Sequence, residues 1–279
     1  MPYTAEISRA NPSCFLFLID QSRSMADPFG AGESNRRKAD GVADAINRLL
    51  QNLVIKCAKE EGVRDYYYVG VIGYGAHVGP AFSGSLAGRE LVPISEVGNM
   101  PARIEERTKK VDDGAGGLVE QRIRFPVWFD PVANGSTPMC QALGRAKAIL
   151  ESWLAQHPAC FPPIVINITD GEATDGDPSG AADALRKLSS NDGEVLLFNL
   201  HLSSQRAMPI EFPDTEVGLP DQFAQLLFRM SSPLPAYMRS IAQQEGCKVS
   251  EGTRGFVFNA DIVAVIRFLD IGTRPSNLR

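Results

Sequence analysis

Short, continuously apolar segments alternate along this chain with longer segments in which apolar residues recur at helical spacing. A short apolar run is typical of a strand buried on both faces, and the longer amphipathic segments are typical of helices that cover such a sheet. This alternation predicts an α/β fold with a doubly wound, mostly parallel central sheet and helices on both faces. The expected strands lie at 14–19, 66–74, 163–169, 195–202 and 255–258.

The amphipathic segments also indicate where the helices begin. Apolar residues recur at helical spacing from Lys38 to Val54 and again after Thr137, where Pro138 suits the first helical position. Glycine and proline in 73–80 turn the chain back after the second strand, which predicts an antiparallel strand at an edge of the sheet. Further helices are expected at 178–188, 221–230, 235–245 and 261–271, and a short strand or hairpin arm at 123–129.

No low-complexity linker interrupts this pattern, so we expect one domain over residues 14–271, with a lead at 1–13 and a tail at 272–279. The lead lacks the basic patch and apolar run of a signal peptide, and no later window is apolar enough to cross a membrane. The five cysteines are scattered without zinc-site spacing, which is typical of reduced residues. We therefore expect a cytoplasmic protein that does not act at a membrane.

Two segments, near 100–130 and 203–220, are longer than the connections of a minimal domain of this class. They either cover edges of the sheet or contact a partner. If the second segment lies beside the binding site, Phe212 and Leu219 are candidate partner contacts.

The charge balance argues against nucleic acid as a partner. The formal net charge is −5 and there is no long basic run, whereas nonspecific nucleic-acid binding needs a concentrated positive face. The small basic patch at 35–38 is typical of the solvated start of a helix.

Chemistry-bearing residues follow the first expected strand. It ends in Asp20, and hydroxyl residues stand two and four positions later, at Ser22 and Ser24. An acid and two hydroxyls at this spacing offer hard oxygen ligands. Open α/β sheets bind ligands at the carboxyl ends of their strands, so the position also favours a binding site.

Two other polar positions have the same kind of placement. Thr137 precedes an expected helix, and Asp170 ends the strand expected at 163–169. If that strand is a neighbour of the strand at 14–19, the loops bring two carboxylates and three hydroxyls together. Magnesium suits such a set, because it prefers octahedral oxygen coordination and keeps some waters or takes an outside ligand.

Three motifs in this order, DQSRS from Asp20, GSTP from Gly135 and ITDGE from Ile168, resemble the von Willebrand factor type A (vWA) domain. That family has a Rossmann-like fold and a metal-ion-dependent adhesion site built from DxSxS, a distant Thr and a distant Asp. The resemblance implies that Ser22, Ser24 and Thr137 bind Mg²⁺, or alternatively Mn²⁺, directly. It implies that Asp20 and Asp170 act mostly through water.

The resemblance also carries an expectation about function. A cation held mainly by hydroxyls stays electron-poor and recruits an Asp or Glu carboxylate from a partner protein, so the chain is expected to be a non-enzymatic, Mg²⁺-dependent protein-binding module. The segments GYGAHVGPAF and GFVFNAD are similar to those of bacterial single-domain members. Such members are often associated with kinase, phosphatase or ATPase partners in stress-response, signalling or defence systems.

Each motif has an ordinary explanation when taken alone. Thr137 before Pro138 is also a typical helix cap, serines are common in turns, and Asp170 before glycine is a typical strand-ending turn. Asp175 and Asp177 are expected to cap the following helix rather than to bind metal.

Two other functions are compatible with the same residues. The metal could only stabilise the loops of a structural scaffold. Alternatively, the chain could be a Mg²⁺-dependent phosphohydrolase in which Asp170 or Glu172 activates a water. Phosphatases of the haloacid dehalogenase kind use a second Asp as acid and base, and Ser22 stands at that position here.

Overall fold

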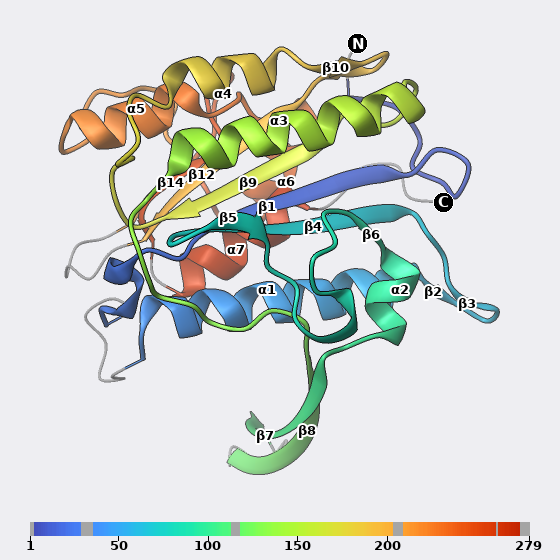
Figure 1. Cartoon of the computed structure of the whole chain (residues 1–279). Helices are drawn as coiled ribbons and strands as arrows, with labels where there is room; N and C mark the ends of the chain where they lie inside the picture. Colours follow the sequence, from blue (N-terminus) through green and yellow to red (C-terminus); the bar gives the residue numbers. More distant parts are fainter. Residues whose placement is uncertain (1–2, 29–35, 113–117, 203–208, 261, 274–279) are drawn as a thin grey trace.

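The computed structural model describes residues 3–28, 36–112, 118–202, 209–260 and 262–273. A twisted sheet crosses the middle of the molecule, and helices cover both of its faces (Figure 1). The doubly wound α/β architecture predicted from the sequence is therefore confirmed.

The strands of the sheet are β1 (Ser13–Asp20), β4 (Tyr67–Tyr74), β5 (Val78–Pro80), β6 (Val92–Pro93), β9 (Ile164–Thr169), β12 (Leu196–Leu202), β13 (Ile210–Glu211) and β14 (Phe256–Ala260). Their order is β13–β14–β12–β9–β1–β4–β5, and β6 also pairs with β4. The pairs among β4, β1, β9, β12 and β14 are all parallel. Antiparallel pairing is confined to β5 and β6 at one edge and β13 at the other, so the predicted antiparallel edge is present and a second one was missed.

β1 lies at the centre of the sheet, between β4 on one side and β9 on the other. The chain therefore extends the sheet first toward one edge and later toward the opposite edge. At such a reversal point the loops leave in different directions, which opens a crevice at the carboxyl ends of the two strands. Asp20 and Asp170, which end β1 and follow β9, meet at this place.

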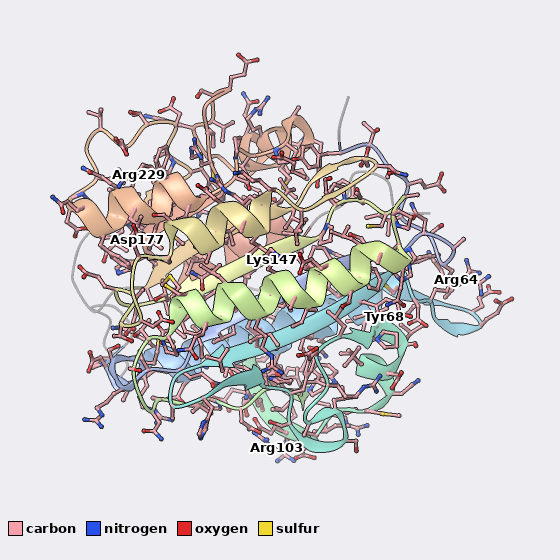
Figure 2. The ribbon with its side chains drawn as sticks, turned by 45° about the horizontal axis from the view of Figure 1, so that its top comes forward. Arg64, Tyr68, Arg103, Lys147, Asp177 and Arg229 are labelled. Carbon is pink, nitrogen blue, oxygen red and sulfur yellow. The ribbon has the colours of Figure 1, made fainter. Side chains whose placement is uncertain are left out.

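Successive residues of β1 face opposite sides of the sheet, as in any strand. Phe15 and Phe17 belong to the core beneath one helical layer, and Leu16 and Leu18 belong to the core beneath the other. The first layer contains α1 (Lys38–Cys57), α2 (Ile94–Asn99), α6 (Ala236–Gln244) and α7 (Ile262–Gly272), and the second contains α3 (Met139–Gln156), α4 (Ser179–Arg186) and α5 (Gln222–Met230). Figure 2 shows Lys147 of α3 on the outer, solvent-facing side of the second layer.

The first long segment forms a two-stranded arm. Strands β7 (Arg103–Asp112) and β8 (Leu118–Val127) pair with each other and project from the body below α1 (Figure 1). An ion pair of 2.9 Å between Arg107 and Asp44 fastens the arm to α1. The arm does not cover an edge of the central sheet, since its strands pair only with each other.

The second long segment contains two residues that we considered as partner contacts. Phe212 and Leu219 are instead buried, with 2% and 7% of their surface exposed. Phe212 stacks on Phe268 of α7, with ring centroids 5.5 Å apart, and Leu219 joins the core of the α3–α5 layer. The contact hypothesis is therefore wrong for these two side chains, because both contribute to the core; residues 203–208 lie outside the described part of the chain.

Several short elements carry no periodic signal and were not predicted. They are the paired strands β2 (Ala58–Lys59) and β3 (Gly62–Val63), the pair β10 (Ser189–Ser190) and β11 (Gly193–Glu194), and the 3₁₀ turns Arg23–Ala26 and Gly84–Leu86. The five cysteines are free thiols, as expected. Among the described helices, none combines the length and apolar character needed to cross a membrane.

Candidate metal centre

Asp20 lies at the floor of the crevice and is fully buried. One carboxylate oxygen accepts a hydrogen bond of 2.8 Å from the Ser22 backbone N–H, and the other accepts one of 2.8 Å from the Thr169 hydroxyl. Burial raises the pKa of Asp20 to about 6, and the hydrogen bonds from Ser22 and Thr169 oppose that rise. A cation bound nearby would compensate for the lost hydration of this carboxylate.

The two serines lie directly above Asp20. Their hydroxyl oxygens are 3.0 Å apart, and the Ser24 hydroxyl donates to Asp170 Oδ1 over 2.7 Å. Because the single hydroxyl proton of Ser24 is directed to Asp170, Ser22 is the donor in the bond between the serines. Lone pairs on both serine oxygens therefore remain available to a cation.

Backbone hydrogen bonds join the first two loops of the site. Asn134 N–H donates to the carbonyl of Gln21 over 2.6 Å, and Arg23 N–H donates to the carbonyl of Gly135 over 3.1 Å. Gly135 has a φ of +94°, and a Cβ at this position would lie 2.2 Å from the amide nitrogen of Ala76. A residue without a side chain is therefore required for the loop before Thr137 to pack here.

Thr137 is held toward the third loop. Its N–H donates to the Thr174 hydroxyl over 3.0 Å, and its carbonyl accepts from Thr174 N–H over 2.9 Å. A Cβ on Gly171 would lie 3.9 Å from the Thr137 hydroxyl oxygen, so this hydroxyl faces the loop that follows β9. Within the described residues the Thr137 hydroxyl makes no hydrogen bond, and it keeps some contact with solvent, because it is not one of the fully buried polar atoms that lack a partner.

The cap of α3 comes from a different residue than expected. Both carboxylate oxygens of Asp175 accept backbone hydrogen bonds of 3.0 Å, from Cys140 and Gln141 in the first turn of α3. Asp175 thus caps the preceding helix rather than the following one, while Asp177 accepts from Ser179 N–H at the start of α4, as predicted. With Asp175 in this role, the Thr137 side chain is not needed as a cap.

Asp170 binds a residue that the sequence reasoning did not select. Its Oδ2 lies 2.8 Å from the ammonium of Lys38, and the exposed fractions of the two side chains are 0% and 5%. Lys38 was expected in a solvated helix start, but it points inward from the first turn of α1. Helical spacing places Lys38 on the buried side of α1 with Val42 and Leu49. This spacing was the sequence signal that could have predicted its inward direction.

A buried polar chain supports the strands beneath the site. The Tyr74 hydroxyl donates to Asn167 over 2.7 Å, and Asn167 donates to Asn199 over 3.0 Å. Asn199 in turn donates to the Ser231 hydroxyl over 3.0 Å. Asn167 and Asn199 interrupt apolar strand runs, and that interruption could have marked them in the sequence.

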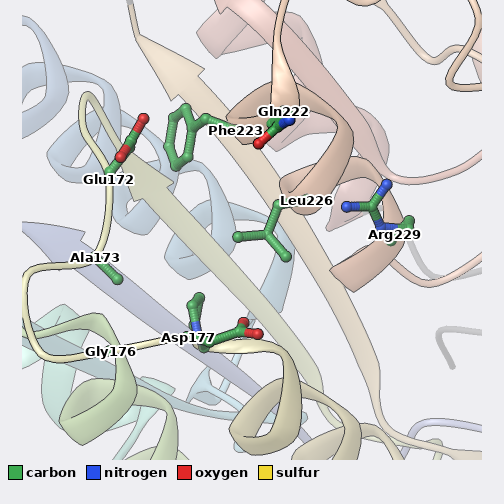
Figure 3. A pocket seen from close by; sticks show the side chains of 9 residues that line it. Glu172, Ala173, Gly176, Asp177, Gln222, Phe223, Leu226 and Arg229 are labelled. Carbon is green, nitrogen blue, oxygen red and sulfur yellow. The ribbon is translucent and has the colours of Figure 1, made fainter.

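A cavity of about 310 Å³ adjoins the loop that carries Asp170. Figure 3 shows Phe223 and Leu226 pointing into it from α5, opposite Glu172 and Ala173. Arg229 and Asp177 add charge at its rim. This cavity is lined by both polar and apolar side chains, and none of the five candidate metal residues is among them.

The donor set fits magnesium. Adjacent corners of an octahedron with bonds of about 2.0–2.1 Å lie about 2.9 Å apart, and the two serine oxygens are 3.0 Å apart. The unpartnered Thr137 hydroxyl supplies a third neutral oxygen. In the part of the chain that the structure describes, no three His, Cys, Asp or Glu side chains gather, so ligation would depend on these hydroxyls.

No known protein family and no curated protein matches the chain by sequence. Solved structures to which it is similar include the ArnB paralog VWA2 from Sulfolobus acidocaldarius, with 12% identity, a TM-score of 0.34 and coverage of 72% of this chain and 37% of that one. Another is the vWF domain of the type V pili tip protein Mfa5 from Porphyromonas gingivalis, with 17% identity, a TM-score of 0.29 and coverage of 58% and 39%.

A structure of three N-terminal domains of the same Mfa5 protein gives 16% identity and a TM-score of 0.29, with 58% of this chain covered and 20% of that one. The chain thus spans 20–39% of the length of these three structures. At such TM-scores the similarities carry no inference about function.

Proposed function

We propose that this chain is a non-enzymatic, Mg²⁺-dependent protein-binding module. Ser22, Ser24 and Thr137 would bind the metal directly, and Asp20 and Asp170 would act through water. The observation that supports the proposal is the hydrogen-bonded set formed by Asp20, Ser22, Ser24 and Asp170, with the Thr137 hydroxyl facing the loop that carries Asp170. When bound, the metal supplies a Lewis-acidic position for a carboxylate.

The contacts of the two acids support a partner-supplied ligand. Asp20 already accepts protein hydrogen bonds at both oxygens, and so does Asp170, from Ser24 and Lys38. Neutral hydroxyls would then form most of the protein's contribution to the metal shell. A cation in such a shell keeps much of its positive charge and attracts an Asp or Glu side chain from another protein.

The same contacts support a role outside catalysis. Each oxygen of these two carboxylates already accepts one hydrogen bond from the protein, so each has only part of its acceptor capacity left for a water. We further propose that the chain acts in the cytoplasm of a bacterium. By the sequence resemblance, its partner would be a kinase, phosphatase or ATPase of a stress-response, signalling or defence system.

The decisive experiment compares wild type with Thr137→Ala. Mn²⁺ binding is followed by electron paramagnetic resonance, and partners are captured from a lysate of the source cells with Mg²⁺ or with chelator. We expect the variant to lose Mg²⁺-dependent capture while its unfolding temperature stays nearly that of wild type. Ser152→Ala, which removes an exposed hydroxyl from α3, is the matched control and should behave as wild type.

Other results would have different meanings. If wild type binds Mn²⁺ but captures the same proteins with Mg²⁺ and with chelator, the metal only stabilises the loops and the docking function is wrong. If wild type binds no Mn²⁺, the metal centre itself is wrong.

A further inference from the structure

Lys38 is a buried lysine whose charge has no established purpose in the site. Lysine is almost never buried without a partner, because removing an ammonium from water is costly. Here the partner is Asp170, at 2.8 Å and itself without exposed side-chain surface. The pair therefore forms a charge-assisted hydrogen bond inside the crevice, next to the serine hydroxyls.

The backbone of Lys38 is fixed as well as its ammonium. Lys38 N–H donates to the carbonyl of Asp27 over 2.9 Å, which fixes the start of α1 against the end of the serine loop. The Asp27 carboxylate lies 3.9 Å from the ammonium and is 58% exposed. Asp27 thus offers a second acceptor at the solvent side of the same group.

Lys38 and a divalent metal would draw on the same carboxylate. Asp170 Oδ1 receives the Ser24 proton and Oδ2 receives the ammonium, so no oxygen of Asp170 lacks a donor. A metal held by Ser24 would place a second positive charge near Asp170. Like charges that share a partly buried site repel each other more strongly than they would in water.

We propose that Lys38 is a tethered cation that holds Asp170 when no metal is bound and that lowers the affinity of the site for divalent metal. This inference rests on the proposed metal centre. Asp20 and Asp170 alone would balance the charge of the metal, and Lys38 adds a buried positive charge that Asp27, 58% exposed, offsets only from the solvent side. The lysine thereby lowers the affinity of the site for the metal and favours an added carboxylate ligand. The metal and the acidic partner would then each bind more tightly in the presence of the other.

Lys38→Met tests the inference, because methionine keeps the length and apolar stem of lysine without its charge. We expect Mn²⁺ alone, titrated by calorimetry, to bind the variant about tenfold more tightly than wild type or better. In chelator the variant should unfold at a lower temperature than wild type, since Asp170 is left buried and unpaired. Saturating Mg²⁺ should return most of that loss. Lys56→Met removes a half-exposed lysine from the far end of α1 and should change neither quantity.

Equal Mn²⁺ affinity in wild type and Lys38→Met would overturn the inference, and so would weaker binding by the variant. Failure of both proteins to bind Mn²⁺ would overturn the metal centre itself. If Lys38→Met does not fold in chelator, Lys38→Gln replaces it, because the amide can still donate to Asp170 without carrying charge. The glutamine variant should also bind Mn²⁺ more tightly than wild type.

Discussion

Gly135 determines, at the scale of a single residue, how closely the loops of the crevice approach each other. Its positive φ and its contact with the backbone of Ala76 leave no room for a side chain. The next two positions lead to Thr137, so the placement of a proposed ligand depends on this glycine. Gly135 matters because of the backbone conformation that it allows, and in the sequence it was noted only as part of the GSTP motif.

Gly135→Ala should destabilise the fold by more than about 2 kcal/mol, because alanine is strained at positive φ and its Cβ meets backbone atoms. Gly144→Ala is the matched control: this exposed glycine lies within α3, and a Cβ there meets no atom within 4 Å. That substitution should stabilise by about 0.5–1 kcal/mol. Urea unfolding of both variants measures the change in the free energy of unfolding, which should fall for Gly135→Ala and rise for Gly144→Ala. Equal changes in the two variants would contradict the role given to Gly135.

His201 gives the fold a dependence on pH. Burial lowers its pKa from 6.5 to about 4, and it stacks on Phe258 with centroids 4.4 Å apart. The imidazole of His201 takes up a proton more readily in the unfolded chain than in the folded protein. The neutral, buried His201 therefore contributes its full stabilisation above the unfolded pKa of 6.5, and this stabilisation is lost as the pH falls toward 4. Between pH 7.5 and 5 the loss amounts to about 2 kcal/mol.

His201→Asn should remove this loss, since the amide oxygen can accept from Asn259 N–H as Nδ1 does and the side chain does not titrate. Urea unfolding at both pH values measures the change for wild type and variant. Carboxylates titrate in both proteins, so subtracting the variant's loss of stability between the two pH values from that of wild type leaves the contribution of His201. A difference near zero would show that His201 does not titrate with a lowered pKa in the fold.

At the scale of elements, periodicity was sufficient for the long helices and the buried strands. α1, α3 and the five parallel strands lie where the apolar pattern placed them, within a few residues. The two-residue strands and the short helix α2 depend on contacts with other parts of the fold, and they are too short to leave a periodic apolar pattern in the sequence. The burial of Phe212 and the capping of α3 by Asp175 depend on which elements become neighbours, so local patterns could not reveal them, whereas the helical phase of Lys38 did indicate its inward direction.

The arm formed by β7 and β8 is an element that can be tested by removal. A two-stranded ribbon is at most marginally stable by itself, and Ile104 and Val119 on this one are 47% and 48% exposed. Replacing residues 107–123 by Asn-Gly keeps the pair of Glu106 and Arg124 and closes it with a favoured turn.

The shortened protein should lose about 1–2 kcal/mol of stability, since removal of Arg107 eliminates a partly exposed ion pair to Asp44 and a cation–π contact with the ring of Phe125. Mn²⁺ affinity should be that of wild type. Urea unfolding and calorimetry measure both quantities. A large loss of stability would mean that the arm is part of the folded body, whereas loss of partner capture alone would identify it as a second contact surface.

At the scale of the whole molecule, we expect the two apolar cores and the buried ammonium of Lys38 to keep the chain folded without the proposed metal. Wild type should retain its circular dichroism spectrum in chelator, because Lys38 neutralises Asp170 there. Saturating Mg²⁺ should raise stability by about 1–3 kcal/mol through mass action. Thermal unfolding in chelator and across a Mg²⁺ series measures this, and unfolding by chelator at room temperature would contradict the role assigned to Lys38.

The crevice joins parts of the chain that are synthesised at very different times. Thr169 lies 149 residues after Asp20, and Asp170 lies 146 residues after Ser24. A nascent chain that has already folded β1, α1 and β4 still lacks the acid and the threonine that complete the floor of the site. Under the proposed function, docking would have to wait until β9 has inserted beside β1, so an incomplete polypeptide on the ribosome would not compete for the partner.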